Sequence, residues 1–389
     1  MNKLKGTVTV FSNSPGQPTG YGIATEALVE RLKRDGVDVA VTSNYGHEGI
    51  KTTYKTKYGK VPLYPRGYDV YSNDSAPINH KHFRAQHPDQ PHLMITLYDV
   101  WVFKGSYDFP VASWVPIDHM PLPPKVAEWV RRENVTPLAM SKFGQTQMAD
   151  KDIESHYVPH SVDTKIFKPV EGIGKQSLSE YMGLTKDKFV VGMNAANKAS
   201  GIIHRKAFGE NLMAFSIFCK KRPDAVLYLH ADPISPHGWN LLALAETLGI
   251  PKDNLLLVDP MSYRYGIEQR ELAGIYSAMD VLLATSYGEG FGVPTIEAQA
   301  CGTPVIVSDF AASADLVGEG WLVGGQPLWD DTQKAYFNIP SVPQIVDALE
   351  NAYNRGKGRS KKAIDFAKQF DHEAVWQKNW MPVLTKLLK

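Results

Sequence analysis

The chain has 389 residues, of which 43% are hydrophobic and 21% are charged. At roughly 150 residues per domain this length indicates two or three domains, and we expect two. The formal net charge of +1 argues against nucleic acid as a partner, because proteins that bind a phosphate backbone usually carry a strong basic excess. No apolar run approaches the roughly 18 residues of a membrane span, and the start MNKLKGTVTVFS shows no secretory signal pattern. We therefore expect a globular protein of the cytoplasm.

Cys219 and Cys301 are the two cysteines of the chain, and both lie in apolar, helix-like surroundings. A buried free thiol behaves as a small hydrophobic side chain. We expect two reduced thiols in the core and assign neither of them a role.

The first half of the chain alternates strand-like and helix-like patterns. Apolar runs predict strands over 6–12, 37–44, 92–99, 111–118 and 136–141. After the first run, apolar residues recur at helical spacing from Ile23 to Leu32, until Asp35 and Gly36 end the pattern. Strands that alternate with crossover segments indicate a parallel sheet and hence an α/β domain.

The pattern breaks at 158–170, VPHSVDTKIFKPV, which is interrupted by prolines and precedes a polar, glycine-containing stretch at 171–180. We place the linker between two domains here. The alternation then resumes, with strands predicted over 188–194, 225–232, 254–259, 280–286 and 304–309 and helices over about 206–221, 238–248 and 268–278. The fold class expected is α/β, with two Rossmann-like doubly wound domains facing across a cleft.

The C-terminal residues 341–389 are predicted to be mostly helical, with a kink at Pro382. Their apolar residues recur at a spacing that would bury one helical face, formed by Trp376, Trp380, Val383 and Leu387. Such a segment has to pack on another part of the protein.

The stretch 287–309, YGEGFGVPTIEAQACGTPVIVSD, places Glu289 and Glu297 eight positions apart across a glycine-rich turn. Pro294 suits the first position of a helix, and Gly302 can end that helix. The amides at such a helix start carry partial positive charge and suit a diphosphate.

A carboxylate beside a diphosphate is repelled, so Glu289 and Glu297 are expected to accept hydrogen bonds from hydroxyl groups on either side of it. A ligand with hydroxyls flanking a diphosphate is a nucleotide sugar. From the residues alone an alternative stays open, in which both glutamates are solvated residues that complement the helix dipole.

The run from Glu289 to Glu297, with the following AQACGTPVI, resembles the E-x7-E signature of the retaining glycosyltransferases of family 4, which have the GT-B fold. The similarity extends over nearly the whole chain. The stretch YVPHSVDTKIFKP resembles the linker motif of the family, ELAGIYSAMDVLLATSYGEGFG its approach to the donor site, and the terminal helix its usual return to the first domain. The resemblance implies an acceptor-side domain, 1–168 plus 372–389, and a donor-binding domain, 169–371.

The same resemblance implies that Glu297 holds the ribose hydroxyls and that Glu289 holds the transferred sugar. The donor-binding residues expected in this stretch are Glu297, Gly290, Phe291, Gly292, Val293 and Thr295. The donor would be a UDP- or GDP-sugar, with no other cofactor required.

Departure of a nucleoside diphosphate builds negative charge, which fixed cations can stabilise. The family usually supplies an arginine and a lysine after the first strand of its second domain. Lys206 corresponds to the family lysine, and Arg205 is taken to replace the arginine, whose usual place is further upstream. Asn197, just before this pair, is counted among the donor-binding residues. Two adjacent cations are otherwise typical of a solvated helix face.

In the first domain, SPGQPTGYG puts Gly16, Gly20 and Gly22 between the first strand and the first helix. The stretch lacks the G-x-G-x-x-G spacing, which argues against a dehydrogenase. It resembles the glycine-rich loop with which these transferases approach the donor phosphates and the acceptor. The alternative is an ordinary turn.

The stretch WVPIDHMPLPP ends a predicted strand with Asp118 and His119. An imidazole there could contact the sugar, and a carboxylate could orient an acceptor hydroxyl. Which of the two acts stays open, as does a purely structural pairing.

The resemblance implies transfer with retention of anomeric configuration, by front-face attack and without a covalent nucleophile. We expect no required metal, because Asp150 and Asp152, which have the spacing of the metal-binding Asp-x-Asp motif, follow a helical stretch. Two alternatives are a phosphorylase-like or sugar-phosphate-synthase relative and a catalytically silent carbohydrate-binding or scaffold protein on the same fold.

The acceptor would be a glycan, a protein or a small molecule. Basic residues alternate with tyrosines in 51–71, which indicates either a recognition surface or a solvated hairpin with lysines on its edge. The basic segment 125–132 contains one tryptophan but is short, so no membrane association beyond a peripheral one is expected.

Overall fold

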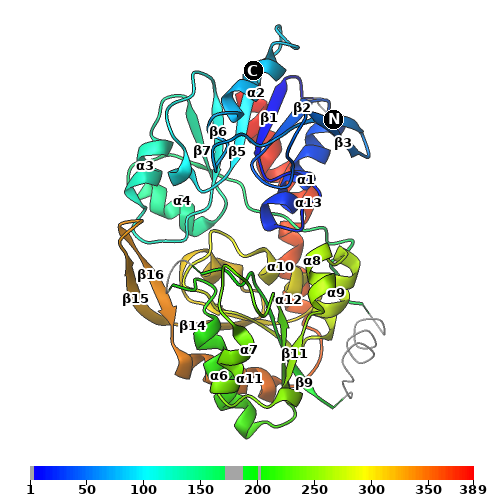
Figure 1. Ribbon diagram of the computed structural model, residues 1–389, viewed down its shortest axis with the longest axis vertical. Coiled ribbons are helices and arrows are strands. Elements are labelled where there is room, and N and C mark those ends of the chain that lie inside the picture. The colour runs from blue at the N-terminus through cyan, green and yellow to red at the C-terminus, as the bar shows by residue number, and fades with distance from the viewer. Residues whose placement is uncertain (1–3, 171–186, 200–202) are drawn as a thin grey trace. The chain divides into compact units, whose positions relative to one another are not determined.

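The computed structural model describes residues 4–170, 187–199 and 203–389 (Figure 1). The stretch 171–180, counted with the predicted linker, lies outside the described residues. The described chain divides into two compact units. The first contains the residues up to Ile117, Pro121–Ser161 and His372–Lys389; the second contains Asp118–Met120 and Val162–Asp371. Two segments differ from the predicted domains. Residues 118–120 and 162–168 were expected in the first domain and belong to the second unit.

An eight-stranded sheet in the order β3-β4-β2-β1-β5-β6-β7-β8 forms the centre of the first unit (Figure 1). Its strands are β1 Thr7–Ser12, β2 Asp38–Ser43, β3 Thr52–Thr56, β4 Gly59–Tyr64, β5 His92–Leu97, β6 Val111–Val115, β7 Val135–Ala139 and β8 His156–Tyr157. The helices are α1 Gly20–Arg34, α2 Ala76–Arg84, α3 Pro124–Val130 and α4 Lys142–Ala149. The five strands predicted from apolar runs are confirmed as β1, β2, β5, β6 and β7, and they pair in parallel.

The β3–β4 hairpin is the antiparallel exception in this sheet. It occupies the segment in which lysines and tyrosines alternate, and β3 is an edge strand. Lys51, Lys55, Lys57 and Lys60 are exposed along it. Charged side chains on an edge strand discourage pairing with another chain, so this part of the alternative reading, a solvated hairpin, is confirmed.

A six-stranded sheet, entirely parallel, forms the second unit in the order β11-β10-β9-β12-β13-β14. Its strands are β9 Phe189–Asn194, β10 Ala225–His230, β11 Leu255–Leu257, β12 Val281–Ala284, β13 Val305–Ser308 and β14 Gly320–Val323. Its helices are α6 Phe208–Lys221, α7 Leu241–Thr247, α8 Pro260–Tyr265, α9 Gln269–Ala278, α10 Val293–Ala300, α11 Val342–Arg355 and α12 Lys361–Ala367. The α/β class with doubly wound parallel sheets is therefore confirmed. None of the helices described here combines the length and apolar character needed to cross a bilayer.

A two-stranded antiparallel hairpin, β15 Gly325–Asp330 and β16 Ala335–Pro340, was not predicted (Figure 1). Its turn is closed by Asp330, whose Oδ1 accepts hydrogen bonds from the amides of Thr332, at 2.8 Å, and Gln333, at 3.4 Å. Met120 pairs with Tyr336 through two backbone hydrogen bonds of 3.1 and 2.8 Å. An isolated antiparallel bridge at Met120 thus joins the segment 118–120 to this hairpin.

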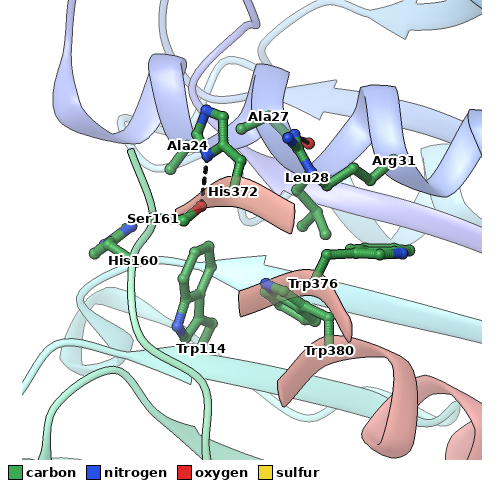
Figure 2. Close-up of a pocket in the computed structure, with 10 residues that line it drawn as sticks. All are labelled: Ala24, Ala27, Leu28, Arg31, Trp114, His160, Ser161, His372, Trp376 and Trp380. Atoms are coloured by element: carbon green, nitrogen blue, oxygen red, sulfur yellow. Dashed lines mark hydrogen bonds between the residues drawn. The ribbon is translucent and has the colours of Figure 1, made fainter. Parts of the chain in front are cut away.

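The C-terminal segment packs within the first unit as α13 His372–Val375, a π-helical turn Trp376–Trp380, and α14 Met381–Leu387. Figure 2 shows the indoles of Trp376, Trp380 and Trp114 around a small cavity beside α1. Trp376 is fully buried and donates to Asp35 at 2.6 Å, and the rings of Trp114 and Trp380 meet edge to face at 5.0 Å.

One detail of this segment was predicted wrongly. Trp376, Trp380 and Val383 are buried as expected, but Leu387 is only partly buried, and Leu384 and Leu388 take its place in the core. The π-helical turn ends just before Pro382, and its wider winding shifts the face that later residues present. Residues chosen at the ordinary helical spacing across this turn therefore no longer all face the core.

Cys219 and Cys301 are free and buried, as predicted. Burial raises the pKa of the Cys301 thiol to about 12, and it also raises the pKa of Cys219. Both thiols are therefore protonated and inert at neutral pH.

We expect Trp376→Ala to destabilise the first unit by roughly 3–5 kcal/mol, because it removes a fully buried indole and leaves a cavity. Denaturant unfolding followed by far-UV circular dichroism measures the effect. The matched control is Trp329→Ala, which removes an indole that is 45% exposed and should cost less than about 1.5 kcal/mol. Equal losses in the two variants would contradict the packing described for the C-terminal segment.

Candidate active site

The candidate site lies where the order of the second sheet reverses direction. Arg205 and Lys206 follow β9, and Glu289 follows β12, which lies beside β9 with Val281 opposite Val191. From β9 the chain continues to β10 on one side, whereas β12 lies on the other side. Open parallel sheets bind ligands at such switch points, outside the carboxyl ends of the strands.

Glu289 is held by both predicted cations. Lys206 Nζ donates to Glu289 Oε1, and Arg205 donates to Glu289 Oε2 at 3.1 Å and to the carbonyl of Gly288. Burial alone would raise the pKa of Glu289, but the charges of Lys206 and Arg205 and their hydrogen bonds lower it below its ordinary value. The carboxylate is therefore ionised, and two cations and one anion form a compact cluster.

Asp118 and His119 join this cluster. His119 is 5% exposed, and its Nδ1 lies 2.7 Å from Asp118 Oδ1, while the other Asp118 oxygen lies 3.8 Å from Arg205. Burial would raise the pKa of Asp118, yet the hydrogen bond and charge of His119 and the charge of Arg205 lower it. The five residues predicted as catalytic are thus brought together in one unit.

Asp330 also contacts this cluster, although no pattern in the sequence predicted it. Its Oδ2 lies 3.3 Å from His119 Nε2. Asp330 ends β15 in a stretch without apolar periodicity or a predicted strand end, so no local signal in the sequence marks it.

Gly288 allows the loop after β12 to approach the segment of Asp118. A Cβ atom at Gly288 would overlap the carbonyl oxygen of Asp118 and would stand 3.1 Å from the ring of Phe337. Glycine is used where a backbone has to come this close. The turn predicted at this position therefore also sets the distance between two parts of the site.

Gly288→Ala should destabilise the protein by roughly 1–3 kcal/mol, because the neighbour that would have to move is backbone rather than a flexible side chain. Urea unfolding measures this change. Gly20→Ala is the matched control, since nothing lies within 4 Å of a Cβ atom at Gly20. The close approach would be disproved if both variants were as stable as the wild type.

Glu297 lies in the second turn of α10 and is 4% exposed. Its Oε2 accepts a hydrogen bond of 2.8 Å from the hydroxyl of Tyr276, which in turn accepts one of 2.7 Å from Asn194. Burial raises the pKa of Glu297 to about 7, although the hydrogen bond from Tyr276 acts in the opposite direction. Tyr276 belongs to the stretch that resembles the family's approach to the donor site, but its contact with Glu297 was not predicted.

The sign of this shift predicts a pH-dependent stability. The folded state holds the Glu297 proton more tightly than the unfolded state, so the contribution of Glu297 is most favourable below about pH 4.5 and is lost as the pH rises through about 7. Glu297→Gln should therefore gain stability over the wild type between pH 5 and pH 8, by up to roughly 3 kcal/mol. Urea unfolding at both pH values tests this.

Glu289→Gln is the control, because the pH dependence of stability at Glu289 has the opposite sign. Because the pKa of Glu289 is lowered, its contribution is present above its unfolded pKa and is lost at acid pH. The variant should be less stable than the wild type at pH 8. A gap between Glu297→Gln and wild type that stays constant with pH would contradict the raised pKa of Glu297.

The other residues predicted to bind the donor surround the start of α10. Gly292 is the N-cap with a φ of +115°, and Gly292 and Val293 are partly exposed. Gly290, Phe291 and Thr295 are buried, and the ring of Phe291 packs against Phe370 at 5.6 Å. The left-handed backbone of Gly292 is one that residues with a Cβ rarely adopt, so the glycine sets how the helix begins.

Asn197 is used differently from the prediction. Its amide donates to the carbonyls of Asp232 and Trp239, and its oxygen accepts from His204 Nε2 at 2.8 Å and from the Trp239 amide at 3.0 Å. These four bonds occupy the whole capacity of the side chain. Asn197 therefore supports its loop, and the side chain has no hydrogen bond left for a ligand.

The predicted glycine-rich loop lies in the first unit, after β1. Gly16 has a φ of +79°, and Gly20 begins α1. Gly22 lies inside the first turn, where its amide donates to the N-cap Thr19 at 3.0 Å. Gly22 also approaches Gln17 closely. The geometry is that of a tight turn into a capped helix, and its contact with phosphates or acceptor stays a prediction.

Asp150 and Asp152 are exposed at and just beyond the C-terminal end of α4. They do not follow a strand. The interpretation of this pair as a solvated helix end is confirmed.

Comparison with known proteins points to one family. Residues 254–337 match the family described as Glycosyl transferases group 1, and this segment contains both Glu289 and Glu297. The chain resembles group 1 glycosyltransferases. One relative, a D-inositol 3-phosphate glycosyltransferase of Catenulispora acidiphila, is 35% identical over 200 residues, which are 49% of this chain and 44% of the relative. The chain spans about half the length of the first curated relatives it matches.

Solved structures share the fold over almost the whole chain. Sucrose-phosphate synthase from Thermosynechococcus elongatus has a TM-score of 0.72 at 19% identity and covers 98% of this chain and 99% of its own. The Anabaena protein HepE, solved with UDP and glucose, has a TM-score of 0.67 at 16% identity and covers 98% of this chain and 100% of its own. These neighbours are GT-B glycosyltransferases, so the GT-B fold class is confirmed.

Proposed function

We propose that the protein is a retaining glycosyltransferase of family 4, which moves a sugar from a nucleotide diphosphate sugar to a hydroxyl acceptor without a metal ion. The cluster of Arg205, Lys206 and Glu289 at the switch point between β9 and β12 is the observation that supports this most. A diphosphate is the anion that two adjacent cations at such a place suit best. The matching family and the HepE structure with UDP and glucose support a nucleotide sugar as the donor.

In this proposal Lys206 and Arg205 stabilise the charge that builds on the departing diphosphate. The ion pairs with Glu289 do not prevent Lys206 and Arg205 from binding a phosphate, because an ammonium group has three donors and a guanidinium group has five. Both cations can hold Glu289 and phosphate oxygens at once. Glu289 keeps their positions fixed and can accept a hydrogen bond from a hydroxyl of the transferred sugar.

Glu297 is proposed to bind the ribose hydroxyls, next to the amides at the start of α10. Its pKa of about 7 means that protonated and ionised forms both exist near neutral pH. The group can therefore donate a hydrogen bond as well as accept one. The second unit would then be the donor-binding domain, and the first unit the acceptor side.

Retention by front-face attack is favoured over a covalent intermediate. Glu289, the carboxylate beside the cations, is already engaged in two ion pairs and is a poor candidate for a nucleophile. In the proposed step the acceptor oxygen forms its bond to the anomeric carbon on the face from which the diphosphate departs. The phosphate oxygen takes the acceptor proton. The acceptor is a glycan, a protein or a small molecule.

Nucleotide release from a panel of UDP- and GDP-sugars tests the proposal. Lys206→Ala should lower kcat by about 10²–10³-fold, because it removes a donor aimed at the leaving group. Glu289→Gln should also lower kcat, since the cations lose the carboxylate that positions them. Lys220→Ala, at the exposed far end of α6, is the matched control and should keep the wild-type rate.

Equal rates in the wild type and the two site variants would show that the site is assigned wrongly. A wild type that binds a nucleotide sugar but never releases nucleotide would instead favour a silent carbohydrate-binding protein. Chelation with EDTA should leave the rate unchanged, and a loss that Mg²⁺ restores would contradict metal independence. The anomeric configuration of the product, read by NMR, checks retention.

A further inference from the structure

His119 lies between two carboxylates. Nδ1 is 2.7 Å from Asp118 Oδ1, and Nε2 is 3.3 Å from Asp330 Oδ2. An ionised carboxylate accepts hydrogen bonds and cannot donate them, so each ring nitrogen has to be a donor for both contacts to form. Only an imidazole ring with a proton on each nitrogen meets this condition.

The charges around the ring agree with that state. The charged groups that face it are Asp118 on its own segment, Asp330 on β15 and, through Asp118, Arg205 before α6. With Glu289 and Lys206 the cluster contains three carboxylates, one guanidinium group and one ammonium group. Burial lowers the pKa of Lys206, and the charge of Glu289 acts in the opposite direction. A doubly protonated His119 supplies the third positive charge and makes the cluster neutral.

The hairpin holds Asp330 in place. Asp330 Oδ1 is fixed by the amides of Thr332 and Gln333, which leaves Oδ2 to face His119. The amide of Asn338 on β16 donates a hydrogen bond of 2.9 Å to the carbonyl of Tyr287. Tyr287 lies two residues before Glu289, so the hairpin is hydrogen-bonded to the loop that carries Glu289.

The hairpin also packs an aromatic ring against His119. The ring of Phe337 on β16 lies 3.7 Å from the His119 ring, centroid to centroid. Met120, the next residue along, forms the backbone pair with Tyr336. The imidazole is therefore fixed by its backbone, by an aromatic face and by two carboxylates.

We infer that Asp330 is a positioning residue of the active site, which holds His119 with donors on both nitrogens beside the Arg205, Glu289 and Lys206 cluster. The inference rests on the proposed transferase function. It makes the β15–β16 hairpin part of the catalytic apparatus, in which His119 presents a fixed positive charge next to the groups that receive the diphosphate. The role of Asp330 is exerted through His119, without contact to the substrate.

Asp330→Asn tests the inference, with Asp331→Asn as the matched control. Asp331 is the next residue in the same turn, but its side chain is 80% exposed and pairs with Lys334. Asp330→Asn should lower kcat by roughly 10- to 100-fold, with a much smaller change in the KM for the donor. Asp331→Asn should match the wild type in both kcat and KM.

A second measurement does not depend on activity. Nitrogen-15 NMR of the histidine rings should show His119 protonated on both nitrogens in the wild type and in Asp331→Asn, and on one nitrogen in Asp330→Asn at the same pH. Asp330→Glu, which keeps the carboxylate, should restore part of the kcat and the wild-type ring signals.

The inference is overturned if His119 carries a single ring proton in the wild type, or if Asp330→Asn and Asp331→Asn lose kcat equally. It is overturned as well if Asp330→Asn keeps the wild-type kcat. A wild type that releases no nucleotide would refute the proposed function, and the NMR comparison would still decide whether Asp330 sets the state of His119.

Discussion

The partly buried ionic contact of Glu289 with Lys206 and Arg205 is the constraint on which the rest of the site depends. Two adjacent cations repel each other, and removing either from water is costly unless an opposite charge stands close by. Glu289 supplies that charge from the loop after the neighbouring strand. The pairing of β9 with β12 fixes the separation of the two loops, so the sheet itself sets the geometry of the cluster.

Glu289 and Glu297 show how the same type of side chain acquires opposite properties in two environments. Glu289 is kept ionised by two cations, whereas Glu297 has a tyrosine hydroxyl as its partner and a pKa raised by burial. Their spacing of eight residues predicts a role in donor binding for both. The spacing does not reveal their difference in pKa, because desolvation and charge partners come from segments distant in sequence, such as those of Lys206 and Tyr276.

The sequence predicts a larger part of the fold than of the candidate site. Strands buried in a parallel sheet read as continuous apolar runs, and all ten predicted runs are strands in the structure. The β15–β16 hairpin lacks such a run, since β15 contains exposed and partly buried residues along its whole length and the turn is polar. Arg205, Lys206 and Glu289 could be found from their places after predicted strands. Asp330 could not, because it meets a histidine 211 positions away and no local pattern records that contact.

The deep burial of Cys219 and Cys301 has a practical consequence. The chain contains two cysteines, and both thiols are shielded from solvent with raised pKa values. Thiol-directed reagents act on the exposed thiolate. A single cysteine introduced on the exposed turn of the hairpin would therefore be the one position in the folded protein that a maleimide dye modifies quickly, without prior removal of the native cysteines. A fluorophore attached there would report on the hairpin directly.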